Sequence, residues 1–289
     1  MDAAMERAVA CMRERFRDPL TVTDIAHSAS LGHFPFSRLF REETGVSPGR
    51  FLAAVRIHEA KKLIENTSMS FAEISGEVGY DSLNAFTHSF TAAVGLSPGR
   101  FRRLCRAQGG GLPAPDPGPS PRSGSVAGTV RLPPGHGNAR VFLGAFATAV
   151  VQYPAVAQAV VDVPSDRPSC YLLRDVPEGR WHLLAVAVAA GTGHDPHAVR
   201  TGLVGGHGTA TTTVTVTADA VTSAAVRLRR PGPVDPPVLL ALPELEPPVT
   251  VVPHPGCAAT TPAAAALERE RAGAGRLRLV PAAPVPPGA

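Results

Sequence analysis

The chain contains nearly the same seven residues twice, at positions fifty apart. Residues 45–51 read GVSPGRF and residues 95–101 read GLSPGRF. A glycine is suited to the left-handed position just past the end of a helix. A serine followed by a proline is suited to the cap and the first residue of the next helix. Each copy of this repeated phrase therefore predicts the end of one helix and the beginning of another, with an apolar residue, Val46 or Leu96, between them.

The segments upstream of the two copies also match. Aligning residues 31–51 with residues 81–101 gives eight identities in 21 positions. The identities include two phenylalanine pairs, Phe36 with Phe40 and Phe86 with Phe90. A spacing of four residues places both members of a pair on one face of a helix. Each phrase therefore ends a helix whose phenylalanines are expected to lie in the core.

A short capped helix and a tight turn are predicted ahead of each of these helices. TVTD (21–24) and SFAE (70–73) have the form of capping boxes, in which Thr21 and Ser70 are the N-caps. A short helix, a tight turn and a second helix make a helix-turn-helix, whose second helix enters the DNA major groove. A long helix over 48–66 connects the two motifs, with a predicted buried stripe of Ala53, Ile57, Ala60 and Ile64. About seven helices are expected up to residue 105.

Residues 3–106 resemble the AraC/XylS-type DNA-binding domain. The most specific segments are SRLFREETGVSPGRF, I-x-x-x-V-G-Y-x-S at 74–82, and GLSPGRFR. The resemblance implies a bihelical domain with two reading helices in successive major grooves on one face of the DNA. The chain departs from the family at Ser30, where a turn glycine is common. It also has Pro35 inside the first reading helix, which requires that this helix begin near His33.

The resemblance places eight candidate DNA contacts on the reading helices. They are Phe34, Ser37, Arg38 and Arg41 on the first helix, and Leu83, Asn84, Thr87 and His88 on the second. Arg38 suits a bidentate contact to guanine, Asn84 suits adenine, and Arg41 suits a phosphate. By itself Arg38 is typical of a solvated surface arginine, and His88 fits a surface position as well as a contact. The second helix has no Lys or Arg, so we expect it to be the weaker and more permissive reader.

Three helix starts are candidate phosphate contacts. Backbone N–H groups at the first turn of a helix, and its partial positive charge, favour phosphate oxygens. Thr21, Ser70 and Ser82 stand at such starts.

After residue 107 the sequence changes character. Residues 108–124 form a Gly/Pro/Ser-rich linker, and residues 125–231 contain short runs rich in Val and Thr. The runs are SVAGTVRL, ARVFLGAF, AVVQY, AQAVVDV, SCYLLRDV, WHLLAVAVA, TTTVTVT and TSAAVRLR. Several strands without intervening helices predict an antiparallel β-sandwich. Residues 232–289 are rich in Pro and Ala and predict a mostly disordered tail.

One stretch of the β-region resembles the prealbumin-like or carboxypeptidase-regulatory-type β-sandwich. Its pattern L-x-x-V-P-x-G-x-W-x-L, at residues 173–183, marks a hairpin in that family. Trp181 is more typical of a packing residue than of a platform for a sugar.

Other features limit the kind of protein and its location. The net charge of +4 neither requires nor excludes a nucleic-acid partner. The cysteines are far apart and form no C-x-x-C pair, which disfavours a zinc site or a dense disulfide framework. The N-terminal segment is neither a signal peptide nor a membrane span. A reduced, cytoplasmic protein without a membrane contact is expected.

No catalytic motif or cofactor site is recognisable. The chain has no nucleophile elbow, Walker loop or H-E-x-x-H motif, so we expect no enzyme and no cofactor. His194 and His197 have a spacing that metal ligands use, but no third ligand is close in sequence. No metal site is therefore expected.

The sequence thus predicts a multidomain chain, α then β. The predicted parts are an all-α pair of helix-turn-helix motifs over 1–107, a linker over 108–124, a β-sandwich over 125–231 and a tail over 232–289. The predicted function is sequence-specific transcriptional regulation, with double-stranded DNA and RNA polymerase as partners. The sandwich would sense a small-molecule effector or dock a protein partner. Two alternatives stay open: an interaction scaffold with a degenerate DNA-binding module, and a sandwich that binds a ligand or carbohydrate.

Overall fold

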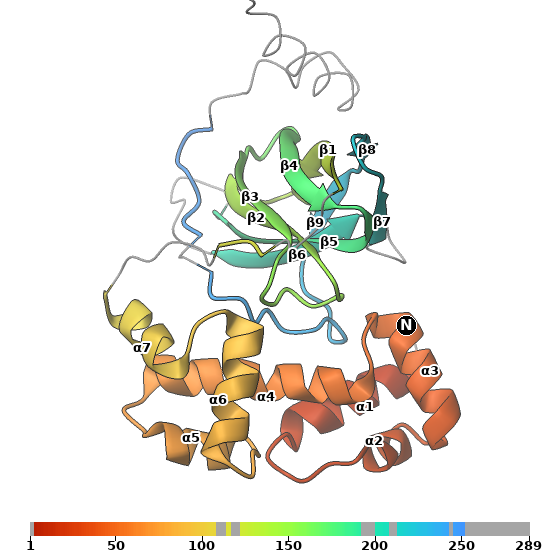
Figure 1. Cartoon of the computed structure of the whole chain (residues 1–289), viewed down its shortest axis with the longest axis vertical. Helices are drawn as coiled ribbons and strands as arrows, with labels where there is room; N and C mark the ends of the chain where they lie inside the picture. Colours follow the sequence, from red (N-terminus) through yellow and green to blue (C-terminus); the bar gives the residue numbers. More distant parts are fainter. Residues whose placement is uncertain are drawn as a thin grey trace, which may run out of the picture.

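The computed structural model describes residues 3–107, 114–116, 122–191, 200–207, 213–242 and 245–251. A helical domain and a β-domain lie against each other, with the chain after the last strand running between them (Figure 1). Seven helices make up the helical domain, as the sequence predicts. They are α1 (Ala3–Glu14), α2 (Val22–Ser28), α3 (His33–Thr44), α4 (Pro48–Asn66), α5 (Phe71–Glu77), α6 (Leu83–Val94) and α7 (Pro98–Ala107).

The connecting helix α4 runs through the centre of the helical domain. Ile57, Ala60 and Ile64 are buried as predicted, whereas Ala53 is exposed and Ala54 takes its place in the core. The stripe was predicted one residue out of phase there, because α4 packs against both helix-turn-helix motifs and its buried surface is wider than one stripe. Proline at the first position of α4 fits the restart that the repeated phrase predicts.

The β-domain is built from nine described strands in one sheet. They are β1 (Ser123–Arg131), β2 (Ala139–Phe146), β3 (Ala157–Val163), β4 (Ser169–Pro177), β5 (Gly179–Ala189), β6 (Thr201–His207), β7 (Thr213–Val216), β8 (Val221–Ser223) and β9 (Val226–Arg229). The main strand order is β3-β2-β5-β6-β9-β1-β4, with β7 on β5 and β8 on β1. The sheet curls until its end strands meet, and Ser169 Oγ on β4 donates to the carbonyl of Asp162 on β3 at 2.8 Å. The result is a nearly closed sheet around an apolar core.

The predicted antiparallel sandwich is not confirmed in this form. One continuous sheet replaces two separate ones, and β1 pairs in parallel with β8 and β9. The predicted hairpin is wrong, because β4 pairs with β1 whereas β5 pairs with β2. Alternation of apolar residues identifies a strand but carries no information about which strand lies beside it. Trp181 is half-buried against the core, and its Nε1 donates to the carbonyl of Pro177, so it is a packing residue.

The observed strands differ from the predicted ones in three places. The run AVVQY (149–153) is a loop between β2 and β3, the run TSAAVRLR divides into β8 and β9, and β6 was not predicted. β6 reads TGLVGGH, and its glycines conceal the strand pattern. Gly205 is required there, because an added Cβ would lie 2.2 Å from the carbonyl oxygen of Arg227 on β9.

The described part of the tail is ordered against both domains. Leu239, Leu240 and Ala241 are each 1% exposed, and further along the chain Asn138 Nδ2 donates to the carbonyls of Pro248 and Val249. The prediction of disorder therefore does not hold for residues 232–242 and 245–251. A run of apolar residues, VLLAL at 238–242, was the signal in a segment otherwise rich in proline.

The remaining expectations concern the cysteines, a metal site and a membrane span. Cys11 and Cys105 carry free thiols. His194 and His197 lie outside the described residues. Within the described part of the chain, no group of three or more His, Cys, Asp or Glu residues is placed to hold a metal. None of the described helices has the length and apolar character needed to cross a membrane.

Candidate nucleic-acid interface

The two reading helices are α3 and α6, and the residues around them repeat at the predicted offset. The turn before α3 contains Ser30 with φ of 59°, and the turn before α6 contains Gly79 with φ of 78°. The helices end at Gly45 and Gly95, which have φ of 76° and 84°. Left-handed backbone at these glycines confirms the helix ends predicted from the repeated phrase. Ser30 adopts the same conformation with a Cβ, which strains the first turn.

A triad of phenylalanines fixes each reading helix to the core. Rings of Phe36 and Phe40 lie 5.4 Å apart, and the ring of Phe40 lies 5.5 Å from that of Phe51. In the second copy the corresponding rings are Phe86, Phe90 and Phe101, with both distances 5.6 Å. All four phenylalanines of the reading helices are fully buried, as predicted. The last residue of the repeated phrase therefore completes each triad and sets the angle between the reading helix and the helix that follows.

The predicted contact residues lie on the opposite, solvent-facing side of these helices. Exposed side chains are Phe34, Arg38, Arg41, Leu83, Asn84 and His88, while Ser37 and Thr87 are half-buried. Phe34 is 84% exposed and Leu83 is 43% exposed, which is unusual for large apolar residues of a folded domain. Pro35 lies in the first turn of α3, which begins at His33 as this proline requires. The structure thus gathers each predicted set on one helix face.

Arg38 has one polar neighbour that the sequence analysis missed. Its Nε lies 3.7 Å from Glu42 Oε1, one turn further along α3, and both side chains are largely exposed. An exposed pair at this spacing contributes only about 0.3–0.5 kcal/mol, so Arg38 can leave it for another acceptor at little cost. The signal was the i, i+4 spacing of Arg38 and Glu42. In contrast, α6 contains no charged Asp, Glu, Lys or Arg side chain.

The helix starts differ in how their N-terminal N–H groups are used. Thr21 and Ser70 form the predicted capping boxes, with Asp24 and Glu73 accepting from the cap backbone at 2.8 and 2.7 Å. The hydrogen bonds from Thr21 lower the pKa of Asp24, and those from Ser70 lower the pKa of Glu73. A carboxylate therefore stands at both starts and opposes a phosphate. Ser82 accepts from the backbone N–H of Ala85 at 3.2 Å, and its first turn contains no acidic residue.

Both reading helices have their C-terminal ends against the β-domain. A Cβ added at Gly45 would lie 2.6 Å from the Cβ of Ala149, and one added at Gly95 would lie 2.8 Å from the ring of Tyr153. Ala149 and Tyr153 belong to the loop between β2 and β3. A helix of twelve residues is about 18 Å long, so the N-terminal ends are directed well away from the β-domain (Figure 1). Those ends carry Phe34, Leu83 and Asn84.

Comparison with known proteins identifies the helical domain. A family model described as "Helix-turn-helix domain" matches residues 13–104. An uncharacterized HTH-type transcriptional regulator, YfiF of Bacillus subtilis, is 38% identical over 93 residues, which are 32% of this chain and 29% of that protein. The Msm operon regulatory protein of Streptococcus mutans is 33% identical over 92 residues, which are 32% of this chain and 33% of that protein. Residues 13–104 form an AraC-type helix-turn-helix domain.

Solved structures match the same helix-turn-helix domain. The DNA-binding domain of AdpA, in complex with a target DNA, is 30% identical, with a TM-score of 0.35, over 36% of this chain and 94% of that chain. A transcriptional regulator from Chromobacterium violaceum is 24% identical, with a TM-score of 0.35, over 37% of this chain and 95% of that chain. The chain spans about a third of the length of the curated relatives that it matches. These matches cover the helix-turn-helix domain and do not extend over the β-domain.

Proposed function

We propose that this chain is a transcriptional regulator that binds double-stranded DNA by placing α3 and α6 in two successive major grooves. The proposal rests on one observation: the two helices expose the same set of positions, on ends directed away from the rest of the molecule. Recognition helices of this class contact base edges with their N-terminal residues. The curated relatives named above are regulators, which supports the same function for this chain.

The two helices differ in what they offer to DNA. Arg38 can form a bidentate contact with the N7 and O6 atoms of guanine, because the weak pair with Glu42 is easily exchanged. Arg41 lies one turn nearer the C-terminus, where the groove wall supplies phosphates. Phe34 offers an apolar surface of the kind that packs on the thymine methyl group. In α6, Asn84 suits adenine and Leu83 suits a thymine methyl, but charge is absent, so α3 supplies more of the specific binding energy.

The three helix starts also differ in how well they can bind a phosphate. Ser82 is the strongest candidate for a phosphate contact, because the N-terminus of α6 has no carboxylate in its first turn. Thr21 and Ser70 remain predicted contacts, although each is already engaged with the acidic residue of its capping box.

The direct test is selection of binding sequences from random duplex DNA, followed by affinity measurements over a range of salt concentrations. Arg38→Ala is expected to lose discrimination at one base pair by about 1–3 kcal/mol. Arg41→Ala is expected to weaken all sequences alike and to reduce the salt slope by about one. Arg131→Ala, an exposed arginine on β1, is the matched control and should change neither quantity.

Two results would contradict the proposal. If the full chain shows no sequence preference and no salt-dependent affinity, the domain is a degenerate module and the interaction scaffold becomes the better interpretation. If Arg38→Ala lowers affinity equally for all sequences, Arg38 contacts phosphate and the assignment of the guanine contact is wrong. RNA polymerase, a small-molecule effector and a protein partner at the β-domain remain predictions from the sequence.

A further inference from the structure

The helix-turn-helix domain is covered, on the side opposite its reading ends, by two segments from the β-domain side. One is the loop of residues 147–156 between β2 and β3. The other is the extended chain of residues 232–242, here called the strap, which follows β9. Figure 1 shows both segments between the sheet and the helices. Together they contact both copies of the repeated phrase.

The loop connects the two helix-turn-helix motifs to each other. Ala149 contacts Gly45 at the end of α3, and Tyr153 contacts Gly95 at the end of α6. The backbone N–H of Tyr153 also donates to the carbonyl of Ala93 at 2.8 Å. Glycine is needed at both helix ends for the left-handed backbone, and both positions also lack room for a Cβ. The repeated phrase therefore serves as a matched pair of docking points, one in each motif.

The strap belongs to the cores of both domains at once. Leu239 and Ala241 pack into the core of the helical domain, whereas Leu240 packs with Phe142 and Phe146 on the sheet. Alternate residues of an extended chain point in opposite directions, so one segment can fill both cores. The strap is also hydrogen-bonded on both sides. Leu239 and Leu240 donate to the carbonyl of Val151 in the loop, and Ala241 donates to the carbonyl of Val94 in α6.

Lys61 attaches the strap to the connecting helix α4. Its Nζ lies 3.5, 3.1 and 3.2 Å from the carbonyl oxygens of Val238, Leu239 and Leu240. Burial lowers the pKa of Lys61 to about 8, so at neutral pH the ammonium group still has three N–H groups for three carbonyls. The ammonium also lies 5.6 Å from the centre of the Phe101 ring. Lys61 therefore connects the strap, α4 and the second phenylalanine triad.

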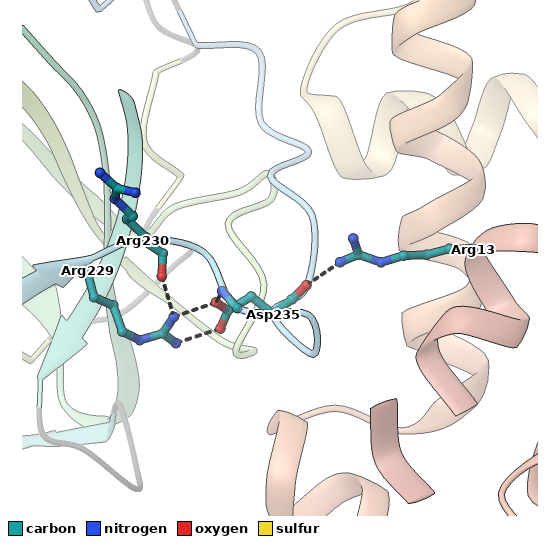
Figure 2. A network of polar contacts seen from close by, with 5 residues as sticks. Arg13, Arg229, Arg230 and Asp235 are labelled. Carbon is teal, nitrogen blue, oxygen red and sulfur yellow. Dashed lines mark hydrogen bonds and ion pairs between the residues drawn. The ribbon is translucent and has the colours of Figure 1, made fainter. Parts of the chain in front are cut away.

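The other end of the strap reaches the first motif. Asp235 binds the Arg229 guanidinium with both carboxylate oxygens, at 2.5 and 2.6 Å, which fixes the beginning of the strap to β9. The carbonyl of Asp235 accepts a hydrogen bond from Arg13 on α1 at 3.2 Å (Figure 2). The strap therefore runs from α1, beside the first helix-turn-helix motif, to Val94 at the end of the second.

We propose that the loop and the strap form a brace that fixes the distance and angle between α3 and α6, so that the β-domain determines which half-site spacing the protein reads. This inference rests on the proposed function. Without the brace, α4 would be the main link between the two motifs. One added base pair between half-sites displaces them by about 3.4 Å and rotates them by roughly 34°. A rigid pair of reading helices cannot follow that change, whereas a pair joined by one helix can adapt more easily.

The test uses the selected site together with two variants of it, in which one base pair is inserted or deleted between the half-sites. The wild-type chain is expected to lose about tenfold or more in affinity for either variant site. Lys61→Met removes the ammonium but keeps an apolar side chain of similar length, and should reduce that loss to within about threefold. Lys62→Met is the matched control, because Lys62 is exposed and pairs with Glu59 on its own helix. Its spacing profile should equal that of the wild type.

A second variant and a second measurement test the brace independently of Lys61→Met. Leu239→Ser removes an apolar anchor of the strap itself, and carries the same test if Lys61→Met does not fold. Hydrogen exchange at the amides of Leu239, Leu240 and Ala241 reports whether the strap has been released. Faster exchange together with an unchanged, steep spacing profile would overturn the brace while leaving DNA binding intact. Unchanged exchange in both variants would also overturn it. If the wild-type chain has no sequence preference on any site, the proposed function fails first.

Discussion

Replacing Gly95 by alanine is the substitution for which the structure makes the sharpest prediction of stability. Gly95 has φ of 84°, and a left-handed backbone costs a residue with a Cβ about 1–2 kcal/mol. The new Cβ would also lie 2.8, 3.0 and 3.2 Å from the Cδ2, Cγ and Cβ of Tyr153. The ring must move, but the backbone of Tyr153 is held by its hydrogen bond to Ala93.

The expected magnitude combines these two effects. Forcing an extra carbon into a packed contact costs about 1–3 kcal/mol, which adds to the backbone strain. We therefore expect Gly95→Ala to lower the free energy of unfolding by roughly 3 kcal/mol. The matched control is Gly49→Ala, in the first copy of the repeated phrase. Gly49 lies inside the first turn of α4, and a Cβ added there would meet nothing within 4 Å, so alanine should raise stability by up to about 1 kcal/mol.

Urea unfolding can follow the two domains separately. Trp181 is the one tryptophan of the chain, so its fluorescence reports on the β-domain, whereas far-ultraviolet circular dichroism at helical wavelengths reports mainly on the helical domain. The cost of Gly95→Ala is then measured again in a Tyr153→Ala background, where the two ring contacts are removed and mainly the backbone strain of about 1–2 kcal/mol should remain. An equal cost in both backgrounds would show that the loop does not lie against Gly95, and the assignment of the docking points would be wrong.

Four further outcomes are expected. Ser30→Gly should stabilise the helical domain by about 1 kcal/mol and so raise its melting temperature, because Ser30 holds a φ of 59°. A lower melting temperature would show that the backbone at Ser30 is not strained. Phe86→Ala should cost about 3–5 kcal/mol by circular dichroism, because its ring is fully buried in the triad. Phe34→Ala should change the free energy of unfolding by less than about 0.5 kcal/mol but weaken DNA binding. Replacing the contacted thymine by uracil should lower the DNA affinity of the wild-type chain but not that of the variant. Burial, assisted by the charge of Lys62, lowers the pKa of His58 to about 4, so the folded state resists protonation of this side chain. The free energy of unfolding should therefore fall by roughly 2 kcal/mol, for this partly exposed group, as the pH falls from about 6.5 to about 4. His58→Gln should remove that part of the pH dependence.

The sequence by itself determined the helical half of this protein. Stops and starts of helices are local events, decided by the left-handed backbone of a glycine and the fixed φ of a proline. Gly45, Gly95, Pro48 and the capping boxes therefore occupy the predicted positions, and both phenylalanine pairs are buried as their spacing requires. The candidate contact residues came from the family resemblance, and periodicity adds only that Ser37, Arg38, Thr87 and His88 lie off the face of the buried phenylalanines.

Only the tertiary structure decided how the strands pair and where the tail lies. The strands that pair with β1 lie about forty residues or more further along the chain, and strand alternation does not specify a partner. Residues 149–153 and 238–242 look like a strand and part of a disordered tail, because their apolar side chains pack against a different domain. Lys61 and Lys62 are the same residue type in adjacent positions, yet Lys61 is half-buried against three carbonyls whereas Lys62 is exposed and pairs with Glu59. Contacts between segments distant in sequence depend on the assembled surface of both domains, and no local pattern records them.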